Sequence, residues 1–207
     1  MHGRFENFIR DKRGFAAVPT HEDHTLVIAG WPFAEFGKNK SDIEGTFIKT
    51  IELAPSFAER LRGAKREERF AGMAVPNYFR KPYGPGWALV GDAGYNKDFI
   101  TAQGIMDAFH DAELCASALD KSFTGEAAFT DAMEEYRCSR DARVKSMYDF
   151  TCQLATLEPP PPELQRLLAA IHGNQQAMDD FVRMNAGTIS PAQFFDPANI
   201  NAMTGAA

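Results

Sequence analysis

The chain has 207 residues, 44% of them hydrophobic, so it is long enough to bury the core of one large domain or two small ones. Its 22 Lys and Arg against 28 Asp and Glu give a formal net charge of -6, which predicts no general attraction to nucleic acid or to an anionic membrane. Its apolar runs are shorter than the ~20 residues of a membrane-spanning helix, and its amino terminus lacks the apolar segment of a secretory signal, so we expect a cytoplasmic protein.

Two strands are predicted near the amino terminus. Residues 15–18, before Pro19, form the first, and the apolar, branched run 24–31 forms the second. This second strand ends before Pro32, which cannot continue a sheet ladder. The polar residues between the two strands predict a hairpin loop.

Apolar residues at helical spacing in 41–62 predict helix, and Pro55 marks the start of a second helical segment within this range. Prolines and glycines then predict a loop in 77–86. Together these elements predict that residues 1–85 form a substrate-side mixed sheet crossed by helices.

A continuous apolar run, 87–92, is typical of a strand buried on both faces. After it, apolar residues recur every three or four positions from Thr101 and predict a helix with one apolar face. That face consists of Ile105, Ala108, Phe109, Ala112, Cys115, Ala116 and Leu119. A longer helix follows Gly125 and runs to about Leu157, which completes a second region, 86–157.

Four consecutive prolines, 159–162, prevent further helix and predict a rigid corner. Short helices follow in the tail, 158–207, whose last residues, 201–207, are expected to fray. The fold class is therefore α+β, of α/β derivation: a mixed sheet, a strand–loop–helix unit and a helical carboxyl-terminal tail.

The three cysteines, Cys115, Cys138 and Cys152, have neither the even number nor the spacing of a disulfide framework or a zinc site. We expect buried, inert thiols. The histidines at 21, 24, 110 and 172 are scattered along the sequence, and no metal site is predicted from them.

The segment that carries chemistry is Gly91-Asp92-Ala93-Gly94, then a polar loop, then Gln103-Gly104 at the start of a helix. This order sets a carboxylate at the carboxyl end of a strand and points the first amides of a helix into the same crevice, where open α/β sheets bind ligands. Glycines allow the backbone to approach a flat ligand closely, and a helix amino terminus suits an anion or a carbonyl that gains negative charge.

This run, from Gly91 through Gln103-Gly104-Ile105 to Asp111-Ala112, resembles the second flavin motif of the aromatic-hydroxylase family of FAD-dependent oxidoreductases. The resemblance implies that Asp92 binds the ribityl chain of FAD, and that amides near Gly104 and Ile105 face the N1/C2 edge of the isoalloxazine. The cofactor-binding residues that it implies are Gly91, Asp92, Ala93, Gln103, Gly104 and Ile105.

The chain departs from the family pattern in three places. It has Tyr95 and Asn96 where many relatives have a histidine, and Phe99 where they have a loop proline. It also contains no Gly-x-Gly-x-x-Gly and no Asp-Gly, so the adenosine half of FAD has no evident site. We therefore expect a partial chain that lacks the amino-terminal dinucleotide-binding half or works with a partner chain.

The resemblance further implies a small organic substrate, with NADH or NADPH as electron donor. Trp31 and Phe33 are the candidate substrate-lining residues, and no residue stands out as a catalytic base. Three hypotheses stay open: a flavin-dependent monooxygenase, or a related halogenase or reductase; a non-catalytic remnant or binding module of that family; and an unrelated α+β protein.

Overall fold

The computed structural model describes residues 4–204. It separates into two compact units, a first unit of Met1–Ala74 with Ala155–Pro159 and a second unit of Val75–Leu154 with Pro160–Ala207. The division into regions 1–85, 86–157 and 158–207 stays a prediction, and its outermost residues, 1–3 and 205–207, lie outside the described residues.

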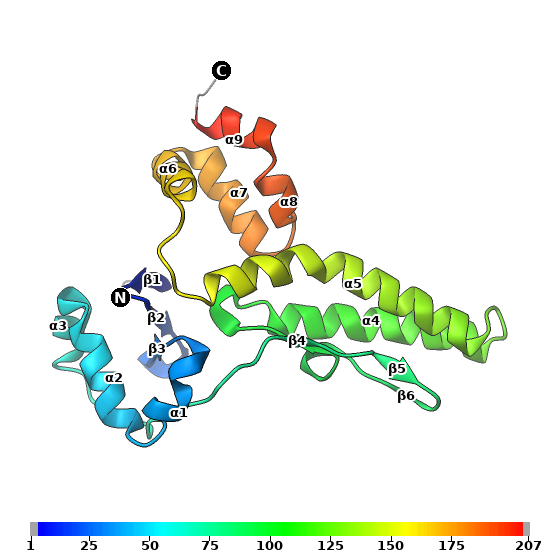
Figure 1. Ribbon diagram of the computed structural model, residues 1–207, viewed down its shortest axis with the longest axis horizontal. Coiled ribbons are helices and arrows are strands. Elements are labelled where there is room, and N and C mark those ends of the chain that lie inside the picture. Colours follow the sequence, from blue (N-terminus) through cyan, green and yellow to red (C-terminus); the bar gives the residue numbers. More distant parts are fainter. Residues whose placement is uncertain (1–3, 205–207) are drawn as a thin grey trace. The chain divides into compact units, whose positions relative to one another are not determined.

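The first unit contains an antiparallel sheet of three strands, β1 (Glu6–Arg10), β2 (Arg13–Pro19) and β3 (Thr25–Gly30), in that order (Figure 1). The two strands predicted from the sequence are β2 and β3. Strand β1 was missed because it joins β2 through Asp11 and Lys12, which take left-handed φ angles of 50° and 56° without the Asn-Gly that usually marks such a turn.

Two helices pack against this sheet. Helix α2 (Ile43–Glu52) and helix α3 (Pro55–Leu61) confirm the helical prediction for 41–62, and a short turn, Phe33–Glu35, leads into α1 (Phe36–Asn39). The buried core between strands and helices consists of Phe15, Ala17, Ile51, Ala54 and Phe57.

The second unit begins with two small ladders, β4 (Tyr78–Phe79) with β7 (Tyr95–Asn96), and β5 (Tyr83–Gly84) with β6 (Trp87–Ala88). Every ladder in the described part of the chain is antiparallel, so the mixed sheet predicted for the first region is not found. The connections explain this difference, because short hairpin loops join antiparallel strands whereas parallel strands need long crossovers.

The prediction of a strand buried on both faces over 87–92 is wrong. Only Trp87–Ala88 is strand, and it pairs with β5 alone. The side chains of Trp87 and Val90 are 46% and 37% exposed, because no described strand lies on the other side of this segment. Residues Gly91–Ala93 then form a 3₁₀ turn.

Two long helices, α4 (Gly104–Phe123) and α5 (Phe129–Leu154), lie side by side as a hairpin (Figure 1). Both were predicted. Their shared core consists of Cys115, Ala118, Ala132, Met133 and Tyr136, and Tyr83 and Ala88 from the β5–β6 ladder pack against it.

Helix α4 buries only part of the face that its sequence suggests: Cys115 is buried and Leu119 packs against the α4–α5 core, but other members of the face are exposed. It turns Asp107 and Asp111 inward and leaves the apolar Ile105 and Phe109 75% and 70% exposed. Ala112 and Ala116, which continue the same face, are exposed as well. An apolar stripe of four residues, 105, 109, 112 and 116, therefore faces away from α5.

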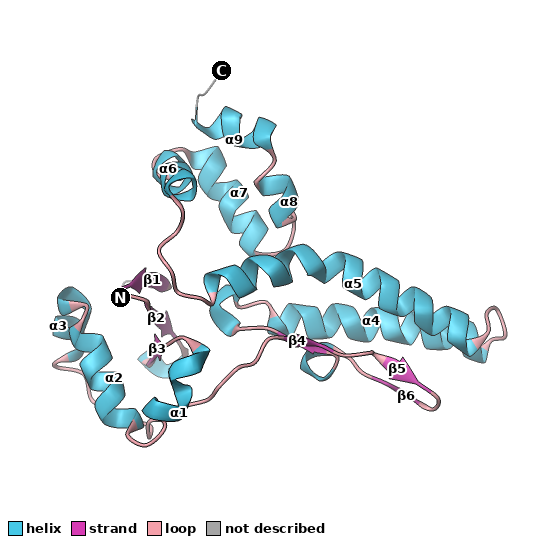
Figure 2. Cartoon of the chain, viewed as in Figure 1, coloured by secondary structure: helices cyan, strands magenta, loops and turns pink. Residues whose placement is uncertain are grey.

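Four helices complete the second unit, α6 (Pro162–Ile171), α7 (Gln175–Asn185), α8 (Pro191–Phe194) and α9 (Pro197–Thr204), and Figure 2 shows that helix dominates this unit. Their core joins the carboxyl-terminal part of α5 through Met147, Leu167, Ile171, Ala177, Met184 and Phe194. Fraying from Asn201 is wrong for residues 201–204, which belong to α9.

The cysteines are all free, and Cys138 and Cys152 share helix α5. Cys115 is buried as predicted, but Cys138 is exposed, because the packed face of α5 runs through Met133, Tyr136 and Arg140. Among the helices of residues 4–204, none combines the length and the apolar character needed to cross a membrane.

Candidate functional site

The structure brings the predicted flavin ligands Asp92 and Gly104 together. Asp92 is exposed on the 3₁₀ turn Gly91–Ala93, and a Cβ atom added to Gly104 would lie 3.8 Å from its Oδ1. Helix α4 begins at Gly104 and has no side-chain cap, so its first-turn N–H groups are open to a ligand. A carboxylate and a helix amino terminus thus meet at one exposed place.

Gly91 holds this turn on helix α4. Its N–H donates a 3.0 Å hydrogen bond to Asp111 Oδ2, and its φ of 54° is one that residues with a side chain rarely adopt. A Cβ atom here would come within 2.9 Å of the Cβ of Ala108. The glycine is therefore needed for packing of the turn against the helix, whatever binds above it.

Gly94 has a similar packing role. A Cβ atom at this position would lie 2.8 Å from Nη1 of Arg140, which is buried beneath it. Arg80 donates two hydrogen bonds to this turn. Its Nη1 donates to the carbonyl oxygen of Ala93 at 3.2 Å, and its backbone N–H donates to the carbonyl oxygen of Gly94 at 2.8 Å. The predicted ligand Ala93 is itself exposed.

The side chain of Gln103 is occupied within the protein. Its buried Nε2 donates to the carbonyl oxygen of Thr101 at 3.1 Å and to that of Asn185 at the end of α7. Gln103 thereby fixes the loop that leads into α4, and its Nε2 is not available to a ligand. The adjacent Ile105 projects into solvent at the first turn of α4.

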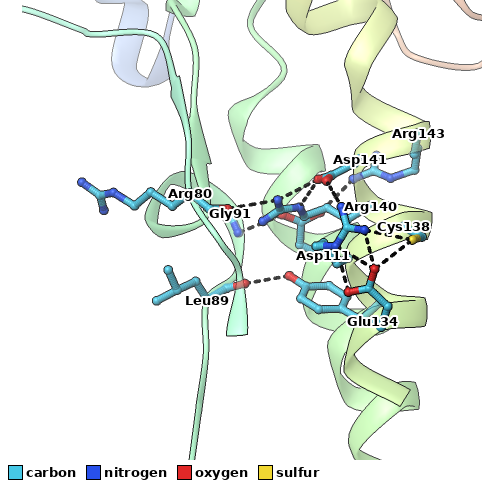
Figure 3. Close-up of polar contacts among 11 residues, drawn as sticks. Arg80, Leu89, Gly91, Asp111, Glu134, Cys138, Arg140, Asp141 and Arg143 are labelled. Carbon is cyan, nitrogen blue, oxygen red and sulfur yellow. Dashed lines mark hydrogen bonds and ion pairs between the residues drawn. The ribbon is translucent and has the colours of Figure 1, made fainter. Parts of the chain in front are cut away.

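Below the turn lies an ion network that we call the Asp111 network: the buried Lys97, Asp107 and Asp111, and the exposed Arg143. Lys97 Nζ binds the Asp107 carboxylate, and Arg143 reaches Oδ1 of Asp107 at 3.5 Å and Oδ1 of Asp111 at 3.1 Å. Asp111 has no exposed surface, and burial raises the pKa of its carboxyl above the ordinary value, although Gly91 and Arg143 counteract the shift. Figure 3 shows Asp111 between Gly91 and Arg143.

Arg140 joins helix α5 to the strands. It is 1% exposed, and its Nε and Nη2 donate to Oδ1 of Asp141 at 2.9 and 2.7 Å (Figure 3). Its guanidinium lies 5.6 Å from the ring centre of Tyr95. Its Nη1 and the Tyr95 hydroxyl have no hydrogen-bond partner among the described residues. Burial, more than any neighbouring charge, raises the pKa of Tyr95.

Sequence reasoning missed the roles of Lys97, Arg140 and Arg143. One signal was present, because Arg140 stands on the otherwise apolar face of α5, where an arginine needs a buried partner. The i, i+4 spacing of Asp107 and Asp111 was another, since it places two carboxylates on one helix face.

The candidate substrate residues Trp31 and Phe33 belong to the first unit. Trp31 Nε1 donates to Oγ1 of Thr50 at 3.0 Å, which ties it to α2, and Phe33 is 60% exposed. The part of these two residues in substrate binding stays a prediction.

No protein-family model matches the chain, and no curated protein matches it. Solved structures do. PqsL of Pseudomonas aeruginosa, described as a probable FAD-dependent monooxygenase, is 22% identical, with a TM-score of 0.60 over 74% of this chain and 43% of PqsL. PqsL in complex with 2-aminobenzoylacetate matches equally well.

The myxobacterial chondrochloren halogenase CndH, described as a new variant of FAD-dependent halogenases, is 19% identical, with a TM-score of 0.64 over 98% of this chain and 50% of CndH. The chain therefore spans half or less of the length of these proteins. At such identities the likeness concerns the fold alone, and that fold is the one of part of an FAD-dependent hydroxylase or halogenase.

Proposed function

We propose that this chain binds the isoalloxazine and ribityl end of FAD and belongs to a flavin-dependent monooxygenase of a small organic substrate. The observation that carries the proposal is the meeting of Asp92 with the uncapped amino terminus of α4 at Gly104. The fold shared with the FAD-dependent proteins PqsL and CndH supports it.

The residues present suit the flavin end of FAD. Asp92 is exposed and offers a carboxylate that accepts hydrogen bonds from ribityl hydroxyls. The first amides of α4, from Gly104 and Ile105, carry the positive end of the helix dipole and suit an oxygen that gains negative charge. The Asp111 network holds the turn that carries Asp92 in place through the N–H of Gly91.

The residues present do not supply a site for the adenosine and pyrophosphate end. The sequence has no Gly-x-Gly-x-x-Gly. The exposed apolar stripe of α4 supports the proposal that a second polypeptide segment covers this helix, because exposure of Ile105 and Phe109 to water is unfavourable. This segment would be either the family's amino-terminal half or a partner chain. Asp92 and the first amides of α4 would hold the flavin, which would supply hydride acceptance from NADH or NADPH and the insertion of one oxygen atom of O₂ into the substrate, with the other oxygen atom leaving as water.

Flavin titration tests this proposal. The purified chain should perturb the visible spectrum of riboflavin, FMN and FAD with a similar Kd, because it contacts only the part that the three share. Asp92→Ala should weaken binding by about tenfold or more, since a hydrogen bond to a charged group contributes ~1.5–3 kcal/mol.

Asp120→Ala is the matched control, because Asp120 is another exposed carboxylate in the same unit, at the far end of α4. The proposal is overturned if Asp92→Ala binds flavin as tightly as the unaltered chain. It is also overturned if no flavin is bound at about 1 mM, where binding would be weaker than about −4 kcal/mol.

A non-catalytic binding module is the second candidate, and the missing dinucleotide motif favours it. Addition of NADH or NADPH to the flavin-loaded chain separates the two. Bleaching of the flavin absorbance indicates an oxidoreductase. An unchanged spectrum, also in the presence of a chain that carries the dinucleotide motif, indicates a module.

A further inference from the structure

The turn between β2 and β3 gathers two imidazoles and a carboxylate. His21, Glu22 and His24 each offer one ligand atom, and these atoms all lie within 4.8 Å of one another. The rings of His21 and His24 are 5.8 Å apart, edge to face. In the sequence the histidines looked scattered, and the turn brings these two together.

The backbone of this turn is strained. His24 N–H donates to the carbonyl of His21 at 3.0 Å, and Thr20 N–H donates to that of His24 at 2.8 Å. Between them Glu22 and Asp23 take φ angles of 53° and 59°, in the left-handed region that residues with a side chain adopt uncommonly. Glycine or asparagine would fit such a turn better, yet both positions carry carboxylates.

The three side chains are free to take a ligand. All are exposed, and none makes a side-chain hydrogen bond or an ion pair with any residue of 4–204. Strain in a turn whose side chains stabilise nothing else points to a use outside the folding of the chain itself.

The donor set selects the kind of ligand. Two imidazole nitrogens with one carboxylate oxygen suit Zn²⁺ and related transition metals, whereas Ca²⁺ and Mg²⁺ prefer oxygen ligands alone. We propose that His21, Glu22 and His24 form a binding site for a divalent transition metal such as Zn²⁺. The site has three protein ligands, so it leaves coordination positions for water or for a ligand from another molecule.

Zinc titration of the full, tag-free chain tests this site. Calorimetry should give one Zn²⁺ bound per chain, and the thermal midpoint should rise with added zinc, because a ligand of the folded state stabilises it. The double variant His21→Ala/His24→Ala should lose both effects. Glu22→Gln should raise the Kd about tenfold, which corresponds to ~1.4 kcal/mol.

The other exposed histidines give the matched control. His110→Ala/His172→Ala removes two imidazoles elsewhere on the chain and should bind zinc as the unaltered chain does. Cys138→Ser, which removes an exposed thiol, should do so as well. Circular dichroism checks that each variant folds.

Equal zinc binding by the His21→Ala/His24→Ala variant overturns the proposal. The absence of stoichiometric binding at about 0.1 mM zinc also overturns it, because the Kd would then be above about 0.1 mM. Flavin binding is a separate measurement on the second unit. Its failure would leave the zinc result unchanged.

Discussion

The carboxylate of Asp111, in the second turn of α4, accepts a 3.0 Å hydrogen bond from the backbone N–H of Gly91. Its other oxygen, Oδ1, accepts a 3.1 Å hydrogen bond from Nη2 of Arg143 on α5. One buried side chain thus connects the turn that carries Asp92 to both long helices. The geometry of the candidate flavin site depends on this carboxylate, although Asp111 lies beneath the site.

Asp111→Ala should lower the free energy of unfolding by ~3 kcal/mol. The change leaves the buried Gly91 N–H without an acceptor and removes one of the two carboxylates that Arg143 contacts, and a buried donor without a partner costs up to about 3 kcal/mol. Urea unfolding measures the effect. Asp120→Ala, an exposed carboxylate on the same helix, should change it by less than ~0.5 kcal/mol. Equal losses in the two variants would contradict the role of Asp111.

The pKa of Asp111 gives a prediction for pH. Burial raises this pKa above the value of about 3.9 in an unfolded chain, so the folded protein holds the proton more tightly. The part of the stability that comes from this raised pKa is therefore fully present below about pH 3.9 and is lost as pH rises through the folded pKa, whereas the packing and the hydrogen bond to Gly91 remain.

The comparison of the unaltered chain with Asp111→Asn isolates this effect. Asparagine keeps an oxygen for the Gly91 N–H but does not titrate. Between about pH 4 and pH 7 the unaltered chain should lose stability relative to the variant as pH rises. A gain relative to the variant would mean that the folded pKa is lowered.

Two glycines of the motif should respond differently to alanine. Gly91→Ala adds a methyl group 2.9 Å from the Cβ of Ala108 at a φ of 54°, so we expect a loss of ~2–3 kcal/mol. Gly104→Ala meets only Asp92 Oδ1 at 3.8 Å, at the start of a helix, so stability should stay the same or rise by up to ~1 kcal/mol.

Flavin binding should respond differently from stability in the Gly104→Ala variant. Gly104→Ala should weaken it despite unchanged stability, because the methyl group lies between the helix amides and the proposed ligand. Unfolding curves and flavin titrations on the same samples separate the two effects. Unaltered flavin binding in Gly104→Ala would show that this amide does not face the ring.

The elements of the fold were largely predictable where they depend on local sequence. Apolar spacing predicted α2, α4 and α5, Pro55 predicted the start of α3, and the proline run predicted that α5 does not continue past it, because these are local signals. The closeness of Asp92 to Gly104 was predicted from the order of the Gly-Asp turn, the loop and the helix, although the strand expected before the turn is not formed as predicted.

The parts that failed depend on partners far away in the sequence. The stripe through Ile105 and Phe109 predicts a buried face, yet the amino-terminal half of α4 turns Asp107 and Asp111 inward instead, because α5 supplies Arg143 as their partner. Residues 87–92 predict a buried strand, yet the described chain supplies one neighbour only. Hydropathy shows which residues need cover but not which segment covers them.

Ala102 offers a test of strain near the site. This alanine has left-handed angles, φ 54° and ψ 32°, just before α4. Ala102→Gly should relieve ~1–2 kcal/mol of steric cost and add ~0.5–1 kcal/mol of unfolded-state entropy, so a net gain of about 0.5 kcal/mol is expected. Ala142→Gly, at an exposed position inside α5 without left-handed φ, should lower stability instead. Urea unfolding of both variants measures the sign.

The apolar stripe of α4 gives the last prediction. Phe109 is 70% exposed, so Phe109→Ser should change the free energy of unfolding by less than ~0.5 kcal/mol. The same change should reduce the fluorescence of a dye that binds exposed apolar surface, because the stripe loses its largest side chain.

Met133→Ser is the contrasting variant, because Met133 is fully buried in the α4–α5 core and should lose several kcal/mol. If Phe109→Ser were as destabilising as Met133→Ser, the stripe would be part of the core of this chain. It would then be closed to a second polypeptide. Retained stability with reduced dye binding instead leaves the face free for the second polypeptide segment that we propose.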